Sequence, residues 1–345
     1  MKTRRAFIKS LLGFGAIILP WSLLPNRFAE TLKVMLGRPP VTLVLPPEAK
    51  SKNDDLNYEI LNRTALDDIY ALTAPEMQGR KAGSVGESKA AEYLSSQLSM
   101  LGLRPMGDLS TGFIQAFTIP PVIETRVNGR LTFRPGDNKN LRFPSVNLIG
   151  ELMGEKTEEI ILLSAHYDHL GIFEGEVYPG ANDNASGVGC VLDVIRRITR
   201  ESETPKRTIV VAFWSAEEMG FVGSQAFLHS PTVPLKQIVA VLNADTVGNG
   251  MIGNFALWGE GENIAVTTLK QAAAESGASA QLTPRGGHNS DSVSFGLAGI
   301  PAATLLAQEW LYKNHTPEDT LALIKSEQVY LATEILYKAV RRLAF

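Results

Sequence analysis

The chain has 345 residues, of which 44% are hydrophobic and 20% charged, the composition of a globular protein with a sizeable core. Its formal net charge of −3 gives no electrostatic basis for binding nucleic acid or an anionic membrane. The single cysteine, Cys190, excludes an internal disulfide, and its apolar surroundings predict a position in the core.

The first 25 residues have the pattern of an export signal. A leader with four basic residues precedes an almost entirely apolar stretch over 10–25. Residues 3–9 follow the twin-arginine export consensus, so we expect this machinery as a partner and a location outside the cytoplasm, such as the periplasm. An ordinary Sec signal is the alternative. No clear small-x-small cleavage site follows, which leaves open whether the signal is removed or tethers the protein to the membrane.

Residues 26–54 are rich in proline and end in a polar run, which predicts a linker or pro-segment outside the fold. We expect residues 55–345 to form a single domain. Helical patterning begins at about 55–75 and returns at 85–101. Segments 113–119 and 123–134 predict a pair of β-strands at a sheet edge.

From residue 146 onward, predicted strands alternate with predicted helices. Continuous apolar strands of this kind indicate an α/β fold with a mainly parallel, mixed central sheet and helices on both faces. The last helix is expected to be capped by Ser326. The predicted strands cover 160–163, 208–214, 238–242 and 301–306, and the predicted helices cover 185–200, 221–229, 262–277 and 327–343.

The conspicuous acids and histidines follow the carboxyl ends of these strands, the edge where open α/β sheets place their sites. Each is a weak signal alone, but together they offer imidazole and carboxylate ligands with no competing cysteine. One spare carboxylate, Glu217, stands beside a ligand. Such a set suits a hydrolytic zinc pair with an open position for water. The five candidate ligands are His166, Asp183, Glu218, Asp245 and His315.

Five short motifs occur in a specific order along the chain. They are His-Tyr-Asp-His at 166–169, Gly-Ala-Asn-Asp-Asn-Ala-Ser-Gly at 180–187, Glu-Glu at 217–218, Asn-Ala-Asp at 243–245 and His-Thr-Pro-Glu-Asp-Thr at 315–320. With this combination the chain resembles the di-zinc aminopeptidases, whose superfamily includes glutamate carboxypeptidase, glutaminyl cyclases and the transferrin receptor ectodomain. The resemblance runs from about Met77 to the C-terminus. It implies a zinc-dependent exopeptidase-like fold and makes 55–345 a catalytic metallopeptidase domain.

The resemblance also implies two Zn²⁺ ions per chain. His166 and Asp245 would hold one ion, Glu218 and His315 would hold the other, and Asp183 would bridge them. A shared carboxylate is what holding two cations about 3.5–4 Å apart requires.

Neighbouring residues would support these ligands. The resemblance makes Glu217 the general base, because a base must not be consumed as a ligand. Asp168 and Asp319 would accept the free ring N–H groups of His166 and His315. A supporting role is also expected for His169.

The groups that contact the substrate are less well defined. Many relatives have tyrosine immediately before the last zinc histidine, whereas this chain has Asn314 there and Tyr312 two places earlier. Asn314, Tyr312 and Asp291 are therefore the candidates for binding substrate or stabilising an oxyanion. Ser292 stands where relatives often have histidine, and His288 is either a loop residue or a substrate contact.

The resemblance predicts an aminopeptidase that hydrolyses N-terminal residues from peptides with a free N-terminus. A glutaminyl cyclase and a carboxypeptidase are the alternatives on the same fold. A non-catalytic receptor is a third, although the complete ligand set argues against it. The sequence leaves the preferred N-terminal residue and the oligomeric state open.

Overall fold

The computed structural model describes residues 60–345 except 109–111, 139 and 285. The predicted export signal and linker therefore lie outside the described residues. The described residues all fall within one compact unit. Among their helices, none is both long enough and apolar enough to cross a membrane.

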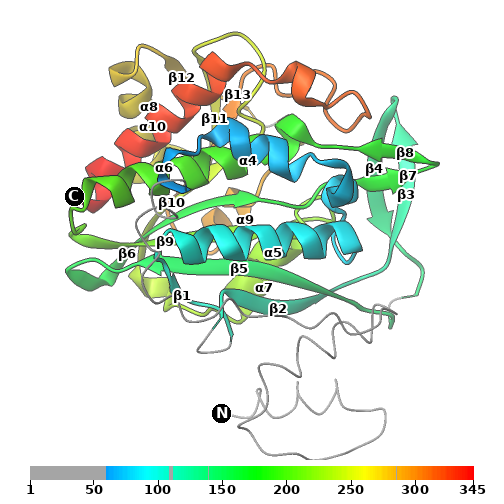
Figure 1. The fold of residues 1–345 in the computed structure, drawn as a ribbon, viewed down its shortest axis with the longest axis horizontal. Coiled ribbons are helices and arrows are strands. Elements are labelled where there is room, and N and C mark those ends of the chain that lie inside the picture. The colour runs from blue at the N-terminus through cyan, green and yellow to red at the C-terminus, as the bar shows by residue number, and fades with distance from the viewer. Residues whose placement is uncertain (1–59, 109–111, 139, 285) are drawn as a thin grey trace, which may run out of the picture. The chain divides into compact units, whose positions relative to one another are not determined.

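A mixed β-sheet forms the centre of this unit (Figure 1). Its strands lie in the order β1-β5-β9-β6-β10-β13-β11-β12, and β2 also pairs with β5. They are β1 (Arg104–Pro105), β2 (Ile114–Ile119), β5 (Phe143–Leu152), β6 (Lys156–His166), β9 (Arg207–Trp214), β10 (Ile238–Ala244), β11 (Asn254–Gly259), β12 (Ser279–Leu282) and β13 (Ala302–Ala307).

The inner strands β9, β6, β10 and β13 run parallel to one another. Strand β5 joins this group antiparallel at one side, and β11 joins it antiparallel at the other. Apart from the exposed start of β6 at 156–158, the inner strands are almost fully buried, as expected for parallel strands covered on both faces. The predicted mainly parallel, mixed sheet is confirmed.

Helices cover both faces of the sheet, again as predicted. Side chains of β6 alternate between two cores, because successive residues of a strand point to opposite faces. Ile161 and Leu163 join the larger core, to which α4, α5, α6, α8 and α10 contribute, whereas Ile160 and Leu162 join the smaller core under α7 and α9. The helices are α4 (Ala65–Leu72), α5 (Val85–Met100), α6 (Gly187–Glu201), α7 (Val222–His229), α8 (Ile264–Glu275), α9 (Ser292–Leu297) and α10 (Ser326–Ala344).

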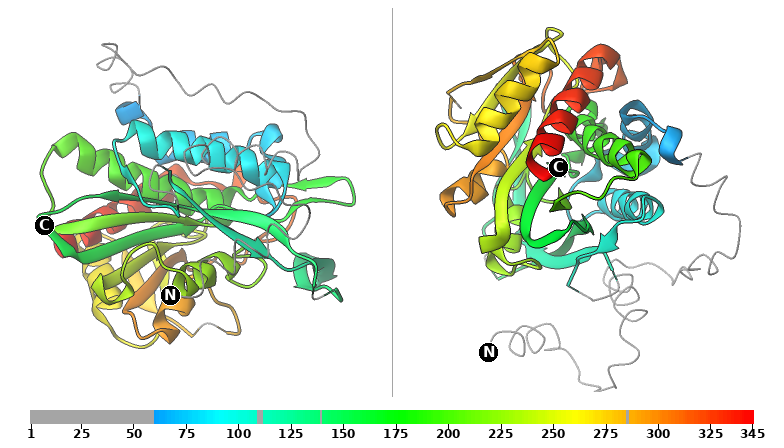
Figure 2. Two further views of the ribbon diagram at one scale, coloured as in Figure 1. Left: turned by 90° about the horizontal axis from the view of Figure 1, so that it is seen from below. Right: turned by 90° about the vertical axis from the view of Figure 1, so that its left-hand side faces the viewer.

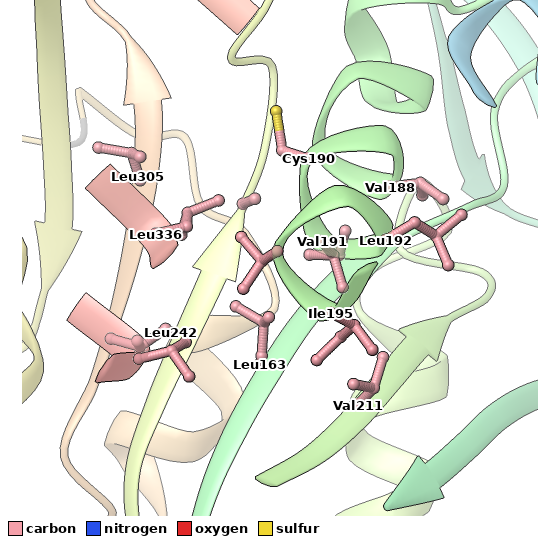
Figure 3. Packing of buried hydrophobic residues seen from close by; sticks show 14 of the residues in the cluster. Leu163, Val188, Cys190, Val191, Leu192, Ile195, Val211, Leu242, Leu305 and Leu336 are labelled. Atoms are coloured by element: carbon pink, nitrogen blue, oxygen red, sulfur yellow. The ribbon is translucent and has the colours of Figure 1, made fainter. Parts of the chain in front are cut away.

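Helix α6 lies at the centre of the larger core. Its residues Val191 and Ile195 pack with Leu163 and Val211 of the sheet, and all four are fully buried (Figure 3). Cys190 is buried in the same cluster, as predicted. Helix α10 comes from the far end of the described chain and lies beside α6 (Figure 2).

Two hairpins outside the main sheet lie together at one end of the unit, β3 (Val122–Val127) with β4 (Arg130–Pro135), and β7 (Gly171–Phe173) with β8 (Glu176–Tyr178) (Figure 1). Leu131 of the first hairpin and Tyr178 of the second share a small apolar cluster. Short helical turns complete the fold: η2 (Pro75–Arg80), η3 (Ala181–Ser186), η4 (Leu235–Gln237) and η5 (Leu321–Leu323).

The structure corrects the predicted pairing of 113–119 with 123–134. Asn128 and Gly129 both have positive φ, 53° and 81°, and form a two-residue turn that divides the second segment into β3 and β4. Strand β2 pairs instead with β5, in the main sheet.

Two helix boundaries also differ from the prediction. Within the described part of the predicted helical stretch 55–75, residues 60–62 are helical, residues 63–64 are not, and α4 begins at Ala65 and ends at Leu72. The Asp67 carboxylate accepts the Thr64 backbone N–H at 2.7 Å, which fixes the start of α4. Ser326 is the first residue of α10 and not its cap. Lys325 occupies the cap position, where its backbone N–H donates to the Gly248 carbonyl at 2.9 Å.

Candidate metal centre

The five predicted ligands meet at one edge of the sheet. His166 is the last residue of β6, Glu218 lies in the turn after β9, and Asp245 directly follows β10. These three strands are parallel neighbours, so their carboxyl ends lie side by side. Asp183 lies in η3, before α6, and His315 enters from the loop after β13.

The ligand atoms form two groups that share Asp183. The Nε2 atom of His166 lies 3.3 Å from Oδ1 of Asp183 and 3.4 Å from Oδ1 of Asp245. The Nε2 atom of His315 lies 3.2 Å from Oδ2 of Asp183 and 2.9 Å from Oε2 of Glu218. Two ligands bound to one tetrahedral zinc ion lie about 3.3 Å apart. The spacing within each group is therefore that of zinc ligands, and Asp183 contributes one oxygen to each group.

His169 lies closer to these ligands than the sequence suggested. Its Nδ1 atom is 2.8 Å from Oε1 of Glu218, and its ring packs edge-on against His315 with centroids 5.8 Å apart. Its other ring nitrogen, Nε2, is buried without a hydrogen-bond partner among the described residues. His169, Asp183 and Glu218 could themselves hold a cation, and so could His166, Glu217 and Asp245. His169 therefore either orients Glu218 or adds a ligand.

Charges within the cluster shift the pKa values of its members in opposite directions. Burial alone would raise the pKa of Glu218, but the His315 charge outweighs it and lowers this pKa to about 2. Burial alone would lower the pKa of His315, but Glu218 and Asp183 raise it to about 10. The carboxylates thus stabilise positive charge at the place where the ligand geometry fits metal ions.

Glu217 is perturbed differently from its neighbour. Burial raises the pKa of its carboxyl well above the usual range, opposed by His166 and reinforced by Asp245 and Asp291. Its backbone N–H donates to Oδ1 of Asp168 at 3.1 Å. A carboxylate that gains a proton this readily has the property required of a general base.

The two predicted supporting residues lie in different positions relative to the histidines. Asp168 lies beside His166, whose Nδ1 is 3.6 Å from the Asp168 carboxylate and 3.2 Å from its backbone oxygen. Asp319 accepts no hydrogen bond from His315, because Nδ1 of His315 lies 2.9 Å from the carbonyl oxygen of Leu131. Asp319 instead accepts the backbone N–H groups of Asn182 and Asp183, at 2.8 and 2.9 Å, and so positions the shared ligand.

Sequence reasoning missed the structural role of Arg80. Its guanidinium is fully buried and donates to four backbone carbonyls, which belong to Leu72, Tyr167, Pro179 and Gly180. These bonds connect the segments that carry His166 and Asp183. Gly79 and Arg80 lie at the start of the resemblance, which begins at about Met77, and this position was the available signal.

The three oxyanion or substrate candidates lie in different places. Asn314 is buried, and its Nδ2 donates to Oδ2 of Asp183. Asp291 is buried with neither carboxylate oxygen hydrogen-bonded by a described residue, and burial raises its pKa to about 7. Tyr312 is 62% exposed and does not line the cavity at the metal ligands. The structure therefore does not bring Tyr312 to the site.

A cavity of about 180 Å³ opens onto the ligands. Besides the ligands and Glu217, its lining includes Arg130, Asn314 and a set of aromatic residues. The Trp310 ring lies edge-on to Trp258, with centroids 5.3 Å apart, and to His288, at 4.8 Å. His288 therefore belongs to the wall of the cavity. Phe221 completes the aromatic part of the lining.

Comparison with known proteins gives the family. The model of peptidase family M28 matches residues 147–340. Aminopeptidase YwaD of Bacillus subtilis is 30% identical over 223 residues, which are 57% of this chain and 45% of that protein. Leucine aminopeptidase 1 of Leptosphaeria maculans is 27% identical over 210 residues, which are 55% of this chain and 54% of that protein. The chain thus spans about half the length of these curated relatives.

Solved structures share the fold. A zinc aminopeptidase from Bacillus subtilis superposes with a TM-score of 0.66 at 20% identity, covering 81% of this chain and 94% of that one. A glutaminyl cyclase from Porphyromonas gingivalis superposes with a TM-score of 0.61 at 18% identity, covering 81% and 97%. The family match includes more than half of this chain and all five candidate ligands, so the chain belongs to peptidase family M28.

Proposed function

We propose that the chain is a zinc-dependent aminopeptidase that hydrolyses N-terminal residues of peptides at a two-metal site. The observation that carries this proposal is the orientation of Asp183, whose two oxygens face His166 and His315 separately. The names of the relatives support the activity, since several are aminopeptidases.

The residues present suit zinc. His166, Asp183 and Asp245 would hold one ion, and Asp183, Glu218 and His315 the other, all through nitrogen or oxygen atoms that zinc binds well. Zinc bound there supplies Lewis-acid activation of a water molecule and of the scissile carbonyl.

Glu217 acts as the general base of the hydrolysis. It lines the cavity beside the ligands, and the Asp168 carboxylate fixes its backbone. It takes a proton from the attacking water and passes it to the amine that leaves, and its raised pKa favours this transfer. The neighbouring carboxylate, Glu218, serves as a ligand, so one glutamate transfers the proton and the other binds metal.

Recognition of the chain end follows from the acids around this base. Glu217 and Asp245 line the cavity, and Asp291 acts electrostatically on Glu217 from nearby. Their negative potential attracts a terminal ammonium group, which places the first peptide bond against the base. An acetylated N-terminus carries no such charge.

A matched set of peptides tests the proposal, with one sequence supplied free, N-acetylated and with an N-terminal glutamine. We expect release of the first residue from the free peptide and little or none from the acetylated one. Comparable cleavage of both would favour an endopeptidase or a carboxypeptidase. Formation of pyroglutamate with loss of ammonia would instead indicate a glutaminyl cyclase.

A further inference from the structure

The β3–β4 hairpin places the positively charged side chain of Arg130 at the cavity. It directly follows the Asn128-Gly129 turn and begins β4. The next residue, Leu131, donates its N–H to the carbonyl of His315 at 3.0 Å, and its own carbonyl lies 2.9 Å from Nδ1 of His315. These two contacts fix the hairpin to the loop of a metal ligand, so Arg130 is held in place before any substrate binds.

Only some of the N–H donors of the Arg130 guanidinium form hydrogen bonds within the described structure. Its Nε donates to the backbone oxygen of Asn314 at 3.1 Å, and its Nη2 donates to the Oδ1 atom of the same residue. The group also lies 5.9 Å from the centroid of the Trp310 ring, a cation–π distance. Its Nη1 has no hydrogen-bond partner, and no carboxylate lies within 4 Å of it, among the residues that the structure describes.

The cavity consequently has two electrically different ends. Glu217 and Asp245 lie with His166 at one end. Arg130 lies at the other, because Asn314 links it to Oδ2 of Asp183, the oxygen that faces His315. No other arginine or lysine of the described chain lines the cavity. A ligand whose ammonium binds at the acidic end would meet Arg130 with the part that follows its first peptide bond.

We propose that Arg130 binds a carboxylate on the residue that follows the scissile bond. The carboxylate is either the free C-terminus of a dipeptide or an acidic side chain at the second position, and both present the same planar group to the unused N–H donors of the guanidinium. The inference rests on the proposed aminopeptidase activity and adds its substrate class. The carboxylates that line this cavity repel a negatively charged group on a substrate. A substrate with such a carboxylate therefore needs the positive charge of Arg130.

Four dipeptide substrates test the inference. Leu-Gly and its C-terminal amide differ only in the terminal charge, and the amides of Leu-Asp and Leu-Asn differ only in a side-chain charge. For the wild type we expect kcat/KM for at least one charged member to exceed that of its neutral partner about ten-fold or more, the usual worth of a charge-assisted hydrogen bond. Whichever pair shows the difference identifies the source of the carboxylate.

Variants of Arg130 assign this preference to the residue. Arg130→Met keeps a long apolar stem against Trp310 and removes the donors, so it should bring the ratio of kcat/KM between the charged and the neutral member of the discriminating pair to about one. Arg130→Lys should keep part of the preference, since it retains the charge without the planar fork. Arg126→Met is the matched control, because Arg126 lies on the same hairpin and pairs with Glu174 and Glu176.

The remaining outcomes would overturn the inference. They are equal wild-type rates within both pairs, a preference that survives Arg130→Met, and an equal loss on charged and neutral substrates, which would mean that Arg130 only supports Asn314. Failure to release leucine from any substrate, or equal cleavage of N-acetylated Leu-Gly, would instead contradict the aminopeptidase activity itself. The two kinds of failure are therefore distinguishable.

Discussion

The Nδ1 atom of His169 lies 2.8 Å from the Oε1 atom of Glu218. The other oxygen of Glu218 faces His315, so each of the two neighbouring histidines contacts one oxygen of this ligand carboxylate. Removing such a support typically lowers metal affinity about 10–100-fold. We expect His169→Ala to lose one zinc ion at concentrations that saturate the wild type, as measured by titration with a competing chelator. His229→Ala, on the exposed end of α7, should bind zinc normally. Unchanged affinity in His169→Ala would contradict this role.

The adjacent glutamates should separate into a base and a ligand. Glu217→Gln keeps the shape of the side chain and should retain zinc while kcat falls by about 10²–10⁴, the usual contribution of a positioned base. Glu218→Gln should instead lower the zinc content, since Glu218 lies 2.9 Å from His315 among the ligands. Turnover of each variant is compared with its metal content by elemental analysis. A Glu217→Gln enzyme of nearly wild-type rate, or one depleted of zinc, would show that the roles are assigned wrongly.

The shared carboxylate of Asp183 predicts two zinc ions per chain. Each of its oxygens lies about as far from a histidine nitrogen as two ligands of one tetrahedral zinc ion lie from each other, about 3.3 Å. Chelation should abolish activity, and full recovery should require two equivalents of zinc. Full activity at one equivalent, with a single ion found by elemental analysis, would argue against the two-metal mechanism and favour the cyclase alternative.

A buried carboxyl outside the metal centre predicts a pH-dependent stability. Burial raises the pKa of Glu87 to about 7, although Ser145, Ser215 and the Gly83 backbone donate hydrogen bonds to it. Its pKa is thus higher in the folded chain than the ordinary value of 4.5 that applies when unfolded. Its contribution to stability is full below about pH 4.5 and is lost as the pH rises through about 7, by at most roughly 1.4 kcal/mol per pH unit.

Glu87→Gln isolates this effect, because the amide cannot ionise. Relative to the wild type, the variant should gain stability as the pH rises from about 4.5 to about 7, in denaturant unfolding followed at several pH values. Glu92→Gln, an exposed position on the same helix, should follow the wild type throughout. A constant difference between wild type and Glu87→Gln would mean that Glu87 titrates normally in the folded chain.

Export through the twin-arginine route is a prediction from residues outside the described part of the chain. Replacing Arg4 and Arg5 together by lysine keeps the charge and removes the consensus, so the full-length protein should remain in the cytoplasm. Cell fractionation with an antibody against the domain measures this. Unchanged arrival outside the cytoplasm would indicate the Sec route.

Local sequence patterns predicted the sheet and the positions of the ligands. The apolar run at 160–163 predicts a buried strand because only a sheet covered on both faces accommodates it, and β6 contains it. His166 ends β6 and Asp245 directly follows β10, so parallel pairing was enough to expect them at one edge. Both inferences use only residues that are close to one another in the sequence, so the sequence alone was sufficient for them.

Tertiary structure decided what surrounds those ligands. The partner of β2, the contact of His315 with Leu131 and the approach of Arg130 to Asn314 all join segments far apart in the chain. Arg130 and Arg126 look alike in the sequence, as basic residues of one hairpin, yet one lines the cavity and the other pairs with surface acids. The packing of the hairpin against the His315 loop distinguishes them. The periodicity of residues along the chain does not predict that packing, because the packing depends on how whole hairpins and loops contact one another in three dimensions.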